Sequence, residues 1–240
     1  MKKNSIYFWG NYVSELLPQN LFFPVDTGKI TENLFTVRDR DTNIYLYSDG
    51  KDTICFDVGY SNNNYLKEEF EKVRVNPDSI SHLFLTHTDE DHAGAVDSDS
   101  KADWHDRAQL FLGREEAKLI NKKAFRKMFF YTPVTISRPY RLLDDGEEVR
   151  VGAITVKALL TPGHTLGHMA YLINRRILIS GDLLILKNGR AAPFYRIWNS
   201  NQRQIGDSLR KIARLDEVEF LGTAHSKYTV NFKEAVQDWI

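Results

Sequence analysis

The chain has 240 residues, of which 42% are hydrophobic and 27% are charged, as is ordinary for a soluble globular protein that can bury a large core. Its 32 Lys and Arg residues balance its 32 Asp and Glu residues, so no overall basic field favours a nucleic-acid partner. The single cysteine, Cys55, excludes an intramolecular disulfide, and its apolar surroundings indicate a buried side chain.

The N-terminal segment lacks the features of a targeting sequence. Its apolar run over residues 6–9 ends at Gly10, which is too short for the core of a signal peptide. No other stretch has the length and hydrophobicity of a membrane span. We therefore expect a cytoplasmic protein without a membrane or nucleic-acid partner, in which residues 1–240 form one domain.

Four strands are predicted in the first quarter of the chain, over residues 22–25, 34–37, 43–47 and 53–58. The last of them contains Asp57 near its end, and this residue either makes a turn or accepts a hydrogen bond from a metal-binding histidine. Residues 64–73 follow with apolar side chains at helical spacing, which predicts an amphipathic helix.

The next strand, over residues 83–85, leads into the most unusual stretch of the chain. Within six positions the sequence places His87, Asp89, Asp91 and His92 where the strand gives way to a loop. Like charges that are crowded together repel one another unless a cation neutralises them. This concentration of imidazole and carboxylate groups therefore indicates a metal site.

A polar loop, a strand and a helix are predicted in the middle of the chain. The loop covers residues 97–106, and we expect its His105 to be solvated. Residues 109–112 form the strand and residues 114–127 the helix. The aromatic cluster at residues 125–131 is interpreted as packing contacts, with a wall that faces the substrate as the alternative.

The second half begins with a predicted hairpin over residues 149–156 and contains an amphipathic helix over residues 201–215. Its other strands each end close to a histidine or an aspartate: residues 158–160 precede His164, residues 176–180 precede Asp182, and residues 218–221 precede His225. His168 is interpreted as a core residue or as one that supports a metal ligand.

These residues together resemble the motifs of the metallo-β-lactamase superfamily. Residues 86–94 are similar to T-H-x-H-x-D-H-x-G, residues 161–167 to T-P-G-H-T-x-G, and residues 181–182 to the G-D motif. Asp89 stands where the family usually has its second histidine, and His225 follows a strand as the family's last histidine does. The motifs occur in the family's order.

The resemblance implies a four-layer αβ/βα sandwich, in which two sheets pack face to face with helices outside. It also implies two divalent metal ions held at one edge of the sheets. The implied ligands are His87, Asp89 and His164 for the first ion, Asp91, His92 and His225 for the second, and Asp182 as the bridge. Imidazole and carboxylate ligands suit zinc, which we expect, and also iron or manganese.

Two metal ions about 3.5–4 Å apart can share a water and present it to an electrophile as hydroxide. The resemblance therefore implies a metal-dependent hydrolase in which Asp91 and Asp182 are the catalytic residues. Its small-molecule substrate would be an ester, a thioester, a lactone or a phosphoester. A penicillin-type substrate is disfavoured, because enzymes of that kind work outside the cytosol.

Asp89 supports an alternative function. A carboxylate in place of an imidazole adds negative charge and favours iron or manganese over zinc. The same substitution resembles the flavodiiron proteins, which reduce oxygen or nitric oxide and in which the counterpart of His92 need not bind metal. The chain would then be a di-iron redox protein served by a separate electron donor. A metal-binding or degenerate family member that serves a binding role is the third possibility.

Aromatic and basic residues near the motifs are candidates for substrate contacts. The aromatic candidates are Phe129, Tyr131, Phe194, Tyr195 and Trp198. The basic candidates, which could hold an anionic group, are Arg126, Arg138 and Arg196. Ordinary packing or a solvated charge is the preferred interpretation of each.

Overall fold

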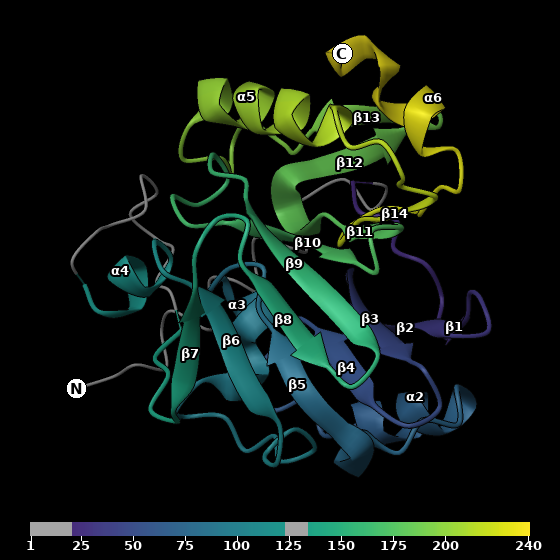
Figure 1. Cartoon of the computed structure of the whole chain (residues 1–240). Helices are drawn as coiled ribbons and strands as arrows, with labels where there is room; N and C mark the ends of the chain where they lie inside the picture. The colour runs from purple at the N-terminus through teal and green to yellow at the C-terminus, as the bar shows by residue number, and fades with distance from the viewer. Residues whose placement is uncertain (1–20, 123–133) are drawn as a thin grey trace.

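The computed structural model describes residues 21–122 and 134–240, and two β-sheets form its centre (Figure 1). The seven strands of the first sheet lie in chain order: β1 (Gly28–Lys29), β2 (Leu34–Asp39), β3 (Thr42–Ser48), β4 (Thr53–Phe56), β5 (Ile80–Phe84), β6 (Gln109–Gly113) and β7 (Tyr140–Leu143). The second sheet has the order β14 (Phe220–Gly222), β11 (Ile177–Ile179), β10 (Met169–Ile173), β9 (Ile154–Leu160) and β8 (Glu148–Val151).

The remaining elements are a hairpin and short helices. The hairpin pairs β12 (Leu184–Lys187) with β13 (Arg190–Pro193). The α-helices are α2 (Leu66–Lys72), α3 (Glu90–Ala93), α4 (Ala117–Ile120), α5 (Gln202–Ala213) and α6 (Phe232–Val236). The 3-10 helices are η1 (Pro77–Ser79), η2 (Gly94–Val96), η3 (Gly181–Leu183) and η4 (Gln237–Trp239). None of the helices in the described part of the chain is long and apolar enough to cross a membrane.

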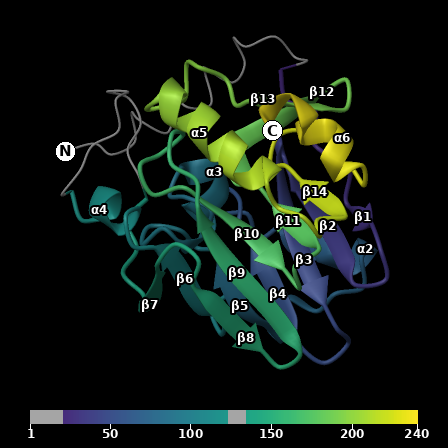
Figure 2. The ribbon, with the colours of Figure 1, turned by 45° about the horizontal axis from the view of Figure 1, so that its top comes forward.

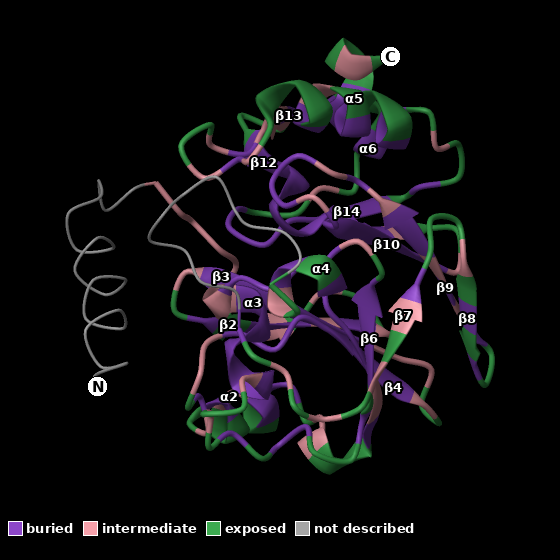
Figure 3. Ribbon diagram, turned by 90° about the vertical axis from the view of Figure 1, so that its left-hand side faces the viewer, coloured by how far each residue is buried: buried purple, intermediate pink, exposed green. Residues whose placement is uncertain are grey.

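The alternation of side chains along the strands divides the core between the layers. On β3 and β4, Tyr45 and Phe56 point toward the second sheet, whereas Leu46 and Cys55 pack in the cluster that contains Phe70 of α2. A third apolar cluster joins the outer face of the second sheet to α5 and α6. Figure 3 shows the buried strands between helices that expose their outer faces. The predicted αβ/βα sandwich is therefore confirmed.

Stacked aromatic rings fill the space between the two sheets. The ring of Phe84 lies 4.7 Å from that of Phe111 and 5.4 Å from that of Phe56, and Tyr171 of the facing sheet contacts both Phe56 and Phe84. Burying each of these side chains contributes roughly 1.5–3 kcal/mol to stability. This packing fixes the two sheets against each other, and so fixes the loops at their ends.

The strands that precede the predicted site residues run in the same direction within each sheet, so these residues follow strand ends at one edge of that sheet. β4, β5 and β6 run parallel to one another, and β11 runs parallel to β14. β9 runs in the same direction as β11, because both are antiparallel to β10. Figures 1 and 2 both place α3 at the end of β5 that faces α5.

Three predictions about local structure were wrong. No strand forms over residues 22–25. Among the described residues of the predicted helix 114–127, only Ala117–Ile120 are helical, because the chain first makes a turn that sends Glu116 inward. His105 is buried rather than solvated, since the neighbouring Trp104 packs its ring 4.9 Å from that of Phe70. The aromatic cluster at residues 125–131 lies outside the described residues.

Candidate metal centre

Asp57 organises the loop that follows β5. Its backbone has φ of 62°, which ends β4 and turns the carboxylate toward the neighbouring strand. Oδ1 of Asp57 accepts a hydrogen bond of 2.7 Å from the backbone N–H of Thr86, and Oδ2 lies 2.8 Å from Nδ1 of His92. Both interpretations of Asp57, as a turn residue and as the acceptor for a histidine, are thus realised in the structure.

The loops of the second sheet supply the facing side chains. His164 follows β9, Asp182 lies in η3 after β11, and His225 follows β14. Gly181 has φ of 50°, and a Cβ there would lie 2.7 Å from Nε2 of His168 and 2.8 Å from Cβ of Thr86. Only glycine allows the chain to pass this close to the first-sheet loop and present Asp182.

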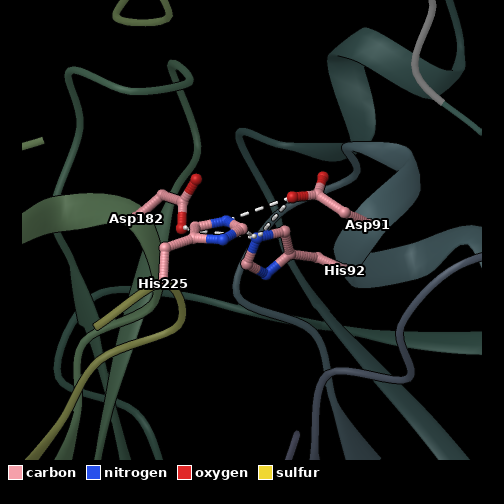
Figure 4. A group of neighbouring side chains, drawn as sticks. All are labelled: Asp91, His92, Asp182 and His225. Atoms are coloured by element: carbon pink, nitrogen blue, oxygen red, sulfur yellow. Dashed lines mark hydrogen bonds and ion pairs between the residues drawn. The ribbon is translucent and has the colours of Figure 1, made fainter. Parts of the chain in front are cut away.

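Four of the predicted site residues form one tight group, which Figure 4 shows with the side chains pointing toward one another. Oδ1 of Asp182 lies 3.3 Å from Nε2 of both His92 and His225. Oδ2 of Asp91 lies 3.1 Å from Nε2 of His225 and 3.4 Å from Nε2 of His92. A divalent ion among two imidazoles and two carboxylates would have a normal set of ligands.

A second group shares Asp182 with the first. It consists of His87, His164 and Asp182, whose potential ligand atoms lie within 4.8 Å of one another. Oδ2 of Asp89 reaches the same place, since it lies 3.0 Å from Nε2 of His164 and 3.3 Å from Nε2 of His87. The structure therefore brings all seven predicted residues together as two adjacent candidate positions.

Backbone and side-chain acceptors orient three of these imidazoles. Nδ1 of His92 donates to Asp57, Nδ1 of His225 donates to the carbonyl oxygen of Asp41 over 2.8 Å, and Nδ1 of His164 donates to Oδ1 of Asn199 over 3.2 Å. When Nδ1 carries the proton, a neutral ring turns the lone pair of Nε2 into the cluster. This is the arrangement that metal-binding histidines require.

The charges within the site favour a cation. Burial opposes the charged form of His92 and of His225, but the nearby carboxylates, including Asp91 and Asp182, outweigh it and raise the pKa of both imidazoles well above the ordinary value. Burial likewise opposes ionisation of Asp182, yet the imidazoles around it hold the pKa of this carboxyl well below its usual range. A site that attracts protons this strongly provides the same attraction for a metal ion.

Unsatisfied atoms test whether the residues fit such an ion. Nε2 of His87 and Oδ1 of Asp182 are buried, and the contacts that they make at 3.3 Å with Asp89, His92 and His225 lack hydrogen-bond geometry. A buried polar atom without a hydrogen bond is costly, and coordination to a cation would remove that cost. The donor set and these two atoms therefore fit a divalent metal ion.

His168 supports the site from behind. Its Nε2 accepts a hydrogen bond of 3.0 Å from the backbone N–H of Asp182, and its Nδ1 lies 2.9 Å from Oγ1 of Thr161. Burial, together with the neighbouring imidazoles, lowers the pKa of His168 well below its ordinary value, so the ring stays neutral and able to accept. Of the two interpretations of His168, the structure favours support of a candidate ligand.

An aromatic cluster lies beside His164 and His225. Phe194 has its ring 5.1 Å from that of His164, and Phe22 has its ring 4.4 Å from that of His225. Tyr195 and Trp198 pack against both phenylalanines. The sequence pointed to the three later aromatic residues but not to Phe22, which lies in a segment interpreted as a strand.

The basic candidates lie elsewhere or remain undescribed. Arg138 donates to the carbonyl oxygens of His105, Asp106 and Ala108, so it ties down a loop and does not reach the candidate centre. Arg196 is exposed on the loop before Asn199. Arg126, like Phe129 and Tyr131, lies outside the described residues.

Replacing Asp57 by asparagine should weaken metal binding by roughly 10–100-fold, because an amide cannot accept from both Thr86 and His92 as the carboxylate does. Chelator competition with Zn²⁺ measures this affinity. Asp216→Asn is the matched control, since the side chain of Asp216 is 93% exposed. Equal affinities for the two variants would show that Asp57 does not support the site.

The chain is also similar in sequence to known proteins. A sequence model of the metallo-beta-lactamase superfamily matches residues 37–225. The lactamase-like protein adaB of Aspergillus niger is 25% identical over 192 residues, which cover 73% of this chain and 51% of that protein. A hydroxyacylglutathione hydrolase of Pseudomonas putida is 29% identical over 172 residues, which cover 68% of this chain and 55% of that enzyme. The chain thus spans about half the length of these curated relatives.

A solved structure shows the same fold. It belongs to a B3 metallo-beta-lactamase described as the first with an active-site glutamic acid, and it covers 95% of this chain and 91% of its own with a TM-score of 0.66. Its sequence identity of 19% limits the comparison to the fold.

Proposed function

The chain belongs to the metallo-β-lactamase superfamily, and on that premise we propose that it is a hydrolase that depends on two divalent metal ions. The main observation behind this proposal is that two clusters of histidine and aspartate side chains lie next to each other and share Asp182. The relatives named as hydrolases and lactamase-like proteins support the same reaction class.

The residues divide into two sets with a shared member. One ion would be held by His87, Asp89 and His164, and the other ion by Asp91, His92 and His225. Asp182 would bind both ions. When bound, such a pair of ions lowers the pKa of a shared water toward neutrality and stabilises the negative charge that forms on the attacked substrate. We expect zinc, with iron or manganese as alternatives, because the ligands are imidazoles and carboxylates.

Asp91 marks the side from which a substrate would approach. Its side chain is 14% exposed, whereas those of Asp89, Asp182 and the four histidines of the centre are 4% exposed or less. Asp91 also faces His92 and His225, so it is positioned to orient a water while it holds the second ion. We propose catalytic roles for Asp91 and Asp182 on this basis.

The substrate is proposed to carry an acyl or phosphoryl group that water attacks. Esters, thioesters, lactones and phosphoesters all meet this condition. Hydroxyacylglutathione, after which one relative is named, is a thioester, so thioesters come first among the candidates. The aromatic rings beside His164 and His225 would suit a substrate with an apolar part.

A panel of substrates tests the proposal. Protein stripped of metal and then reloaded with Zn²⁺, Fe²⁺ or Mn²⁺ is assayed against thioesters, lactones, esters and phosphodiesters. We expect at least one class to be hydrolysed by the reloaded protein and none by the stripped protein. Hydrolysis that is equal with and without metal would contradict the proposal.

Asp89 favours a second candidate function. Its carboxylate lies 3.0 Å from Nε2 of His164, so the first position contains an anionic group that is well suited to iron. The chain would then be a di-iron redox protein that receives electrons from a separate donor. Bound iron together with oxygen consumption in the presence of an artificial reductant, and no hydrolysis, would establish this function in place of the first.

A further inference from the structure

Glu116 is a buried carboxylate that joins two loops of the candidate centre. Its Oε1 accepts hydrogen bonds of 2.9 Å from the backbone N–H and 2.8 Å from the hydroxyl of Thr88. Its Oε2 accepts hydrogen bonds of 2.6 Å from the hydroxyl of Thr165 and 3.2 Å from the backbone N–H of Gly167. The two carboxylate oxygens thus bind different loops: Oε1 binds the loop after β5, and Oε2 binds the loop after β9.

The residues that donate to Glu116 lie next to candidate metal ligands in the sequence. Thr88 lies between His87 and Asp89, and Thr165 directly follows His164. The residues that we assign to the first metal position are therefore adjacent in sequence to the two hydroxyls that Glu116 binds.

Close backbone packing strengthens the connection. A Cβ at Gly167 would lie 1.9 Å from the backbone N of Glu116, so the loop after β9 rests directly on the turn that carries Glu116. The carboxylate and the backbone of one residue together fix the position of this loop relative to the loop after β5.

Burying the ionised carboxylate of Glu116 is energetically unfavourable. Glu116 is 0% exposed, and its burial raises the pKa of the carboxyl, although His87 and the hydroxyls of Thr165 and Thr88 act in the opposite direction. An apolar side chain would fill the same volume without that cost, but it could not accept four hydrogen bonds. The arrangement therefore serves to position the donors and not merely to fill space.

We propose that Glu116 is a positioning residue that sets the distance of His87 and Asp89 from His164, and thereby the affinity of the first metal position. We expect the second position to depend less on Glu116, because Asp57 accepts from His92 and the carbonyl oxygen of Asp41 accepts from His225. This inference rests on the proposed metal-dependent function.

Glu116→Gln is the test variant, because it keeps the shape of the side chain and removes one acceptor. Whichever way the amide points, its NH₂ faces either the backbone N–H of Thr88 or that of Gly167, and one loop loses its anchor. Zn²⁺ is titrated into metal-free protein with chelator competition, and bound zinc per chain is counted by native mass spectrometry. We expect one site to weaken by roughly 10–100-fold and the other to keep its wild-type affinity.

Two further variants complete the design. Glu115→Gln is the matched control, since this neighbour is partly exposed and pairs with Lys118, and it should bind zinc as the wild type does. Thr165→Val removes a single hydrogen bond and leaves the carboxylate in place, so it should fold even if Glu116→Gln does not. It should weaken the same site by a smaller factor than Glu116→Gln.

The outcomes separate the two proposals. If Glu116→Gln and Thr165→Val lower the melting temperature but leave both zinc affinities unchanged, Glu116 is only structural and the inference is wrong. Equal weakening of both sites would also contradict it. A wild-type protein that binds two zinc ions and hydrolyses nothing would contradict the proposed function alone, because the affinities of the variants could still be compared.

Discussion

Asp182→Ala is expected to lower kcat/KM by at least about a thousandfold, which corresponds to roughly 4 kcal/mol of transition-state stabilisation. Asp182 is the only residue that belongs to both candidate metal groups in the described part of the chain, so its loss affects both positions at once. The metal content should fall below two ions per chain. The protein should remain folded, because removing a buried carboxylate from among carboxylates and imidazoles leaves the apolar core between the sheets intact.

The control for this variant is Asp216→Ala, which removes a carboxylate from the surface. Turnover and metal content are measured for both variants, together with their circular dichroism spectra. Unchanged turnover in a folded Asp182→Ala protein would refute the role assigned to Asp182. A loss of turnover with both metals still bound would limit that role to catalysis.

Asp89→His should shift the metal preference of the protein toward zinc by about tenfold or more relative to iron, which is roughly 1.4 kcal/mol. The substitution replaces an anionic oxygen ligand by a neutral nitrogen at a point that already faces Nε2 of His87 and of His164. It restores the histidine that is usual in the family's first motif. Metal analysis after growth in medium that contains equal zinc and iron measures the shift.

Asp89→Asn separates charge from ligand type, because it removes the negative charge without adding an imidazole. If Asp89 binds metal, the asparagine variant should lose metal from the first position and not exchange one metal for another. Identical metal content in the wild type and both variants would show that Asp89 is not a ligand.

The sequence predicted the fold and the members of the candidate centre because its short motifs at strand ends resemble those of a known family. Strands that run in the same direction end at the same edge, so His164, Asp182 and His225, each close behind a strand, lie at one edge of the second sheet. The family's motifs supplied the expectation that these loops meet. That residues 1–240 form one domain, and that the centre holds two ions, stay predictions.

The supporting contacts could not be predicted, because they depend on tertiary packing. Glu116 lies in a segment whose composition favours a helix, where a carboxylate is normally solvated, and only the turn before α4 sends it inward. His105 became buried through the packing of Trp104 on Phe70, which are 34 positions apart in the chain. Asn199 and Phe22 likewise reach the histidines only through contacts between distant segments.

Anomalous diffraction from crystals grown with Zn²⁺ tests the central claim most directly. We predict two peaks, each about 2.0–2.2 Å from its ligand atoms, with Asp182 in contact with both. One peak should lie among His87, Asp89 and His164, and the other among Asp91, His92 and His225. Crystals that show no peak between these side chains, even with excess zinc, would contradict the account.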